Sequence, residues 1–176
     1  VVLVLTYVAI GAAAPGYLSG ATASVVVSNS LVLMLISLGT MIVILTRNID
    51  VSSGSVLGLS AAVLGLSLDA GVSLPLAIAF CLLTGAAAGA FNGLMVAYLG
   101  IPSIVATLGT LGLYRGIMLV LTGGRWIEDL PQNLKALAGN LGFGFSALTV
   151  VVLVLMVLVW LGLRKTHFGR YFYAVG

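Results

Sequence analysis

The sequence predicts an all-α, multi-pass transmembrane helical bundle that forms a single domain over residues 1–176. Of the 176 residues, 61% are hydrophobic and only 6% are charged, whereas a soluble domain carries about 25% charged residues. The mean hydropathy of +1.29 and the 23 glycines are typical of membrane helices. These values exclude a water-soluble globular fold and a disordered chain. The scattered basic residues leave no continuous face for nucleic acid.

Six apolar segments divide the chain, and polar or turn-forming residues separate them. They cover residues 1–14, 25–46, 54–68, 74–99, 103–122 and 147–163. Because a helix needs about 20 residues to cross the hydrocarbon core, 25–46, 74–99 and 103–122 predict full spans. Segment 147–163 is apolar on every face and predicts a lipid-facing last span. Segment 1–14 would be about 21 Å long as a helix, so we expect a truncated span and a piece of a longer membrane protein.

The distribution of basic residues predicts the orientation of the bundle. The predicted spans place Arg47, Arg164, Lys165 and Arg170 on one side of the membrane. They place Arg125 and Lys135 on the other side, where the negative charges of Glu128 and Asp129 offset the two positive charges. The side richer in basic residues is normally cytoplasmic. We therefore expect the C-terminal end of the sequence in the cytoplasm and residues 123–146 outside.

The extracytoplasmic segment 123–146 predicts a short amphipathic helix. Pro131 stands at a favoured helix-start position, and Leu130, Leu134 and Leu137 recur at helical spacing. Such a helix either lies at the interface without a partner or serves as a docking ledge for an extracytoplasmic protein.

Glycines four residues apart predict close packing between helices, because a missing side chain lets two backbones approach. The strongest pattern is the triple step in segment 74–99. The glycines with this spacing are Gly54, Gly58, Gly85, Gly89, Gly93, Gly112 and Gly116.

Residues 46–55, TRNIDVSSGS, are unusually polar for a stretch between two apolar segments. The polar side chains after the first arginine are Asn48, Asp50, Ser52, Ser53 and Ser55. This stretch is either a cytoplasmic turn or a re-entrant break, since 54–68 would span only about 22 Å as a helix. Irregular backbone at membrane depth lines cavities, so the second interpretation predicts a pathway for a neutral, hydroxyl-rich solute. Further candidates for that pathway are Asn92, Thr107, Thr110, Tyr114 and Arg115.

Arg115 lies within a predicted span, where a charge costs at least about 2.5 kcal/mol and indicates function by default. Two structural alternatives are open. The side chain can extend to the interface, or it can pair with Asp69 on the same predicted side.

The sequence contains no catalytic residues that we can assign. The four acidic residues and the single histidine give neither a metal-ligand set nor a nucleophilic triad, and no phosphate-binding GxxxxGK[ST] motif is present. We therefore expect no metal and no enzymatic activity on this chain.

Three stretches resemble bacterial ABC importer permeases of the ribose and related sugar class. NIDVSSGS at 48–55 resembles the family's IDLSVGS signature, and THFGRYFYAVG at 166–176 is similar to its TxFGRxxYAxG motif. NGLMVAYLGIPSIVATLGTLGLYRG at 92–116 resembles the following pair of spans. TRNIDVS, GTLGLYRGIM and GGRWIEDLP are similar to the branch that imports autoinducer-2, a small polyhydroxylated signal.

The resemblance implies an inner-membrane permease that pairs with a second permease chain, the same or related. It also implies two cytoplasmic ATPase subunits, which would bind ATP and Mg, and a periplasmic solute-binding protein; no cofactor is expected on this chain. Ser53 departs from the family, which commonly has valine there. The family's coupling loop lies beyond the AVG motif, so we expect this sequence to be the N-terminal part of a permease.

Two other classes of function remain open. An ATP-independent channel or ion-coupled transporter would use Asp50 or Arg115 as a relay. A purely structural membrane subunit would use 46–55 as a turn and the glycines for packing alone.

Overall fold

The computed structural model describes residues 2–127, 131–132, 134–135 and 146–176. Within these ranges every element is a helix, which confirms the predicted all-α class. The elements are α1 (Val2–Ala13), the 3₁₀ helix η1 (Pro15–Leu18), α2 (Gly20–Leu45), α3 (Ser53–Asp69), α4 (Leu74–Ala97), α5 (Ser103–Thr122), α7 (Ala147–Lys165) and α8 (His167–Val175).

Four helices of the described chain are long and apolar enough to cross a membrane. The spans are Ser24–Leu45, Leu74–Ala97, Ser103–Thr122 and Leu148–Lys165. α1 and α3 are shorter; the 17 residues of α3 extend about 26 Å at 1.5 Å per residue. The chain is therefore a multi-pass membrane segment, as predicted.

One helix begins earlier than predicted, and another was not predicted at all. α2 begins at Gly20 rather than at 25 because Ser19 caps it, accepting the Thr22 N–H at 3.3 Å. α8 was not predicted; it begins where the Thr166 hydroxyl accepts the Gly169 N–H at 3.2 Å. The predicted amphipathic helix in 123–146 falls mostly outside the described residues.

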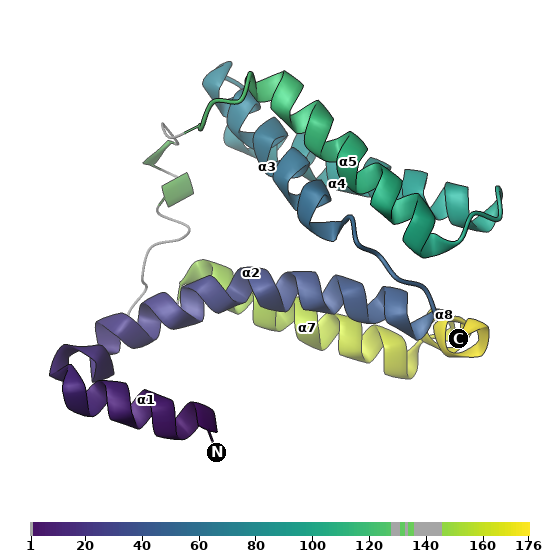
Figure 1. The fold of residues 1–176 in the computed structure, drawn as a ribbon. Coiled ribbons are helices and arrows are strands. Elements are labelled where there is room, and N and C mark those ends of the chain that lie inside the picture. Colours follow the sequence, from purple (N-terminus) through teal and green to yellow (C-terminus); the bar gives the residue numbers. More distant parts are fainter. Residues whose placement is uncertain (1, 128–130, 133, 136–145) are drawn as a thin grey trace.

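The helices form two groups (Figure 1). α3, α4 and α5 pack against one another, and α2 lies alongside α7. The irregular segment 46–52 joins α2 to α3, and α8 contacts α2 near the C-terminal end of the sequence. The two ends of segment 46–52 therefore belong to different helix groups.

A small cluster of buried apolar residues lies within the α3–α4–α5 group. Leu59, Ala88 and Tyr114 form it, and Val56 and Met118 pack against them. Many large apolar side chains elsewhere are exposed, as expected where helices face lipid rather than water.

The predicted packing glycines fall into two sets. A Cβ at Gly58 would lie 3.1 Å from the Met118 sulfur on α5, and one at Gly85 would lie 3.3 Å from the Ser60 hydroxyl on α3. These two glycines therefore lie at helix contacts. No atom of the described chain comes within 4 Å of a Cβ built at Gly54, Gly89, Gly93, Gly112 or Gly116. Close packing at those five positions stays a prediction.

Two glycines of the C-terminal motif pack against backbone instead. A Cβ built at Gly169 would overlap the carbonyl of Leu163 at the end of α7, and one at Gly176 would overlap the carbonyl of Leu45. The motif thus ties α8 to the ends of both α7 and α2.

Replacement of Gly169 by alanine should destabilise the full-length protein. The added methyl would overlap the Leu163 carbonyl, and overpacking of this kind costs about 1–3 kcal/mol. Gly162→Ala is the matched control, because a Cβ there meets nothing within 4 Å inside α7. Thermal unfolding in detergent should show a lower midpoint for Gly169→Ala alone; equal midpoints for the two variants would contradict the assigned contact.

Candidate functional site

Segment 46–52 crosses from α2 to α3, and the N–H groups of residues 46–48 still donate to carbonyls in the last turn of α2. Beyond residue 48, side chains of α5 support the backbone. The Ile49 N–H donates to the Ser103 hydroxyl at 3.1 Å, and the Val51 N–H donates to the Thr107 hydroxyl at 3.2 Å. Ser103 and Thr107 are four residues apart and so share one face of their helix. Two hydroxyls thus replace the partners that a helix would have supplied.

Asp50 shapes the start of α3. One of its carboxylate oxygens, Oδ1, accepts the Ser52 N–H at 2.8 Å and the Ser52 hydroxyl at 2.7 Å. The hydroxyls of Ser53 and Ser55 donate to the backbone carbonyls of Asp50 and Ser52. Ser52 is fully buried, so these bonds hold the helix start in place.

Asn92 on α4 and Tyr114 on α5 continue from Ser52 into the bundle. The Asn92 amide nitrogen donates to the Ser52 hydroxyl at 2.7 Å, and the Tyr114 hydroxyl lies 3.1 Å from the Asn92 amide oxygen. The Tyr114 hydroxyl also lies 2.9 Å from the carbonyl of Ala88. Because Asn92 and Tyr114 are buried, this polar chain links all three helices of the group.

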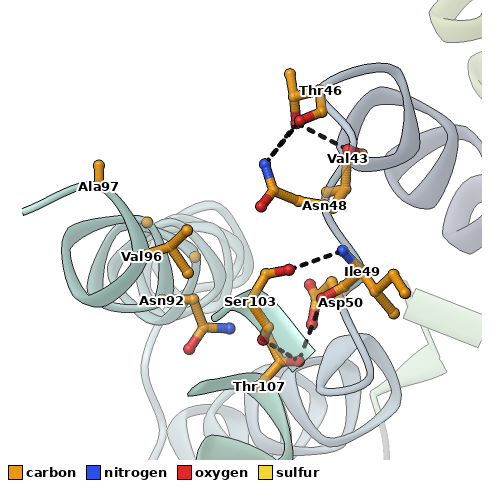
Figure 2. Close-up of a pocket in the computed structure, with 12 residues that line it drawn as sticks. Val43, Thr46, Asn48, Ile49, Asp50, Asn92, Val96, Ala97, Ser103 and Thr107 are labelled. Carbon is orange, nitrogen blue, oxygen red and sulfur yellow. Dashed lines mark hydrogen bonds between the residues drawn. The ribbon is translucent and has the colours of Figure 1, made fainter. Parts of the chain in front are cut away.

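A cavity of about 410 Å³ opens beside this network, and we call it the Asp50 cavity (Figure 2). Its lining residues are Val43, Thr46, Asn48, Ile49, Asp50, Gly89, Asn92, Gly93, Val96, Ala97, Ser103 and Thr107. The lining supplies hydroxyls, amides and one carboxylate, and none of these residues is a lysine or an arginine. Such a surface suits an uncharged solute that carries hydroxyl groups.

A second cavity, of about 700 Å³, lies between α2, α3 and α4, and we call it the α2–α4 cavity. Ser53, Ser60 and Cys81 are among its lining residues. Asp50 and Asn92 line both cavities. The two spaces therefore adjoin at these two side chains.

The structure divides the predicted pathway residues into three sets. Asn48, Asp50, Asn92 and Thr107 line the Asp50 cavity, and Ser53 lines the α2–α4 cavity. Ser52, Thr110 and Tyr114 are buried, and Ser55 donates to its own helix turn. Arg115 is exposed on α5 and makes no ion pair with Asp69. A role for any of them in transport stays a prediction.

Two lining groups were not predicted. Thr46 and Ser103 line the Asp50 cavity. For Ser103, the sequence contained a pattern that could have predicted this position. Ser103 precedes Thr107 by one helical turn, so a hydroxyl pair on one face could have been inferred. Gly89 and Gly93 also line the cavity, which helix-packing spacing did not indicate.

Apolar spanning helices with a partly polar cavity between them are typical of membrane transport proteins. Residues 21–176 match the family described as branched-chain amino acid transport system / permease component, and the chain belongs to this family. It is 54% identical over 175 residues to the autoinducer 2 import system permease protein LsrC of Salmonella typhi, and 53% identical over 175 residues to that of Escherichia coli O9:H4 strain HS.

Each alignment covers 99% of this chain. It covers 50% of the Salmonella protein and 51% of the Escherichia protein, so the chain spans about half the length of the curated relatives it matches. No solved structure matches the chain. The predicted resemblance to importer permeases is confirmed.

Replacement of Ser52 by alanine should lower the thermal midpoint of the full-length protein. Asn92 would lose a buried hydrogen bond and Asp50 a partly buried one, and an unpaired buried polar group costs about 1–3 kcal/mol. Ser60→Ala is the matched control, because the buried Ser60 hydroxyl has no hydrogen-bond partner among the described residues. Scanning fluorimetry should show a lower thermal midpoint for Ser52→Ala and an unchanged midpoint for Ser60→Ala. If both variants unfold at the same temperature as the wild type, the network does not contribute to stability.

Proposed function

We propose that this chain forms part of the permease subunit of an ABC importer and contributes to the path taken by autoinducer-2 or a related sugar. The observation that carries the proposal is the Asp50 cavity, a space with hydroxyl, amide and carboxylate groups in its lining among spanning helices of a permease-family chain. ATP would be hydrolysed with Mg on separate ATPase subunits, since the sequence contains no phosphate-binding GxxxxGK[ST] motif.

The chemistry of the cavity supports a neutral polyol rather than an amino acid as the solute. The description of the matched family refers to branched-chain amino acid transport, whereas the names of the relatives refer to autoinducer 2 import. An amino acid carries a carboxylate as well as an ammonium group, and each charge removed from water needs a partner of opposite charge. The lining of the Asp50 cavity offers no cationic side chain and adds a carboxylate of its own. Hydroxyl groups, in contrast, can bond to its amides and hydroxyls.

The proposed assembly contains two permease chains, the same or related, two cytoplasmic ATPase subunits and a periplasmic solute-binding protein. It would lie in the bacterial inner membrane, surrounded by lipid. The distribution of basic residues supports an orientation with the C-terminal end of the sequence in the cytoplasm, because that side would then hold Arg47, Arg164, Lys165 and Arg170.

Purification of the full-length protein from its own membranes should recover an ATPase subunit in near-equal amount. Mass spectrometry of the purified complex measures this and also shows whether a related second permease is present. A membrane protein that is purified with an unrelated tag provides the control for carry-over. If no ATPase is recovered under gentle detergent, the importer proposal loses its energy source.

Uptake by vesicles that contain the complete system should depend on ATP and not on the proton gradient. Radiolabelled autoinducer-2 should accumulate with ATP inside the vesicles, and an uncoupler should have little effect. Uptake that an uncoupler abolishes and ATP depletion leaves intact would favour the ion-coupled alternative. Unlabelled leucine should compete far less well than unlabelled autoinducer-2, because the Asp50 cavity lacks a partner for its carboxylate.

A further inference from the structure

We propose that Asp50 and Asn92 form a solute-selecting pair where the two cavities adjoin, and that Ser52 and Tyr114 hold this pair in its working orientation. The pair would take an uncharged solute through its hydroxyl groups and disfavour anionic ones. This inference rests on the proposed function and assigns specificity within it.

The position of the pair follows from the two cavity linings. Val43, Asp50, Gly89 and Asn92 are the residues that both linings share. Of these four, only Asp50 and Asn92 carry polar side chains. A solute that moved between the Asp50 cavity and the α2–α4 cavity would pass them.

The pair presents one free acceptor and one free donor. Asp50 uses only Oδ1 for Ser52, and its other carboxylate oxygen makes no hydrogen bond with any residue that the structure describes. The Asn92 amide nitrogen carries two hydrogens, and the recorded bond to Ser52 uses one. Figure 2 shows the Asn92 amide nitrogen on the side that faces the segment carrying Asp50. A hydroxyl group both donates and accepts, so it can satisfy both groups at once.

Ser52 and Tyr114 fix the orientation through a chain of bonds that runs in one direction. Ser52 donates its one hydrogen to Asp50 and therefore accepts from the Asn92 nitrogen. The Asn92 oxygen then faces Tyr114, whose one hydrogen it shares with the Ala88 carbonyl. The Asp50–Ser52 bond thus sets which end of the Asn92 amide faces Ser52, and Tyr114 adds a donor at the oxygen end. Without the Tyr114 hydroxyl, a flip of the Asn92 amide would sacrifice one hydrogen bond fewer. The Asn92 N–H groups would then be held less firmly in their orientation.

The charge of the lining sets the class of solute. The lining of the Asp50 cavity contains one acidic residue and no basic residue, so we expect it to oppose anions. Gly89 and Gly93 line this region, and a Cβ built at either position would project into open space. A phosphorylated sugar would meet repulsion where a free sugar meets hydrogen-bonding groups.

The first test measures the potential beside Asp50 without any transport step. Val96 lines the cavity, and Val96→Cys would be introduced into the full-length protein after replacement of Cys81 and every other cysteine by alanine. Cationic and anionic methanethiosulfonate reagents of equal size would then modify the new thiol. Asp50→Asn should lower the ratio of the cationic to the anionic rate by at least about threefold.

Asp69→Asn is the matched control for this change, because Asp69 lies at the far end of α3 and lines neither cavity. It should leave the ratio of rates unchanged. An unchanged ratio in Asp50→Asn would overturn the assignment of Asp50 to the cavity.

The second test separates binding from turnover in vesicles that contain the complete importer. Asp50→Asn should raise the KM for autoinducer-2 about tenfold, because a hydrogen bond to a charged acceptor becomes a neutral one. Tyr114→Phe should raise KM severalfold with the maximal rate per folded transporter retained. Tyr98→Phe is its matched control, because Tyr98 is 82% exposed.

Three outcomes are distinguishable. KM values that match those of the Asp69→Asn and Tyr98→Phe controls would overturn the selecting pair and its positioning chain. A Tyr114→Phe variant that lost only maximal rate would assign Tyr114 a purely structural role, against the inference. A wild-type importer that transports no neutral sugar would refute the proposed function, and with it the selection of a sugar by this pair, while the thiol test would still decide whether Asp50 sets the cavity potential.

Discussion

Segment 46–52 leaves helical geometry within an apolar bundle, and its backbone N–H groups need partners that lipid cannot supply. Ser103 and Thr107 supply two of them from one face of α5. The carboxylate of Asp50 then holds Ser52, and Ser52 accepts from Asn92. The start of α3, the position of α4 against it and the shape of the Asp50 cavity all depend on these bonds.

Polar contacts have this importance because the apolar core is so small. Helices in a bilayer gain little from hiding apolar side chains from one another, since lipid is equally apolar. The core of Leu59, Ala88 and Tyr114 is accordingly slight, and Tyr114 contributes through its hydroxyl as well as its ring. A hydrogen bond between helices can select one arrangement of them where apolar contact alone would allow several.

Glycine serves three different purposes in this chain, although its spacing in the sequence looks uniform. Gly58 and Gly85 admit a neighbouring side chain, whereas Gly89 and Gly93 leave cavity space open. Gly169 fits against the backbone at the end of α7, where any side chain would overlap a carbonyl. A four-residue spacing shows only that glycines share a helix face, because it contains no information about what that face meets.

The sequence by itself determined the class of fold, the main spans and the polar stretch at 46–55, because hydropathy and length act locally. It also assembled most of the candidate site, since Asn48, Asp50, Asn92 and Thr107 do line one cavity. Only the tertiary structure decided which polar groups face that cavity and which are used up inside the bundle. Ser52 and Tyr114 looked like pathway residues, yet both are buried in hydrogen bonds between helices. Their role depends on how α3, α4 and α5 are rotated against one another, and that rotation is set by contacts between residues up to 58 positions apart.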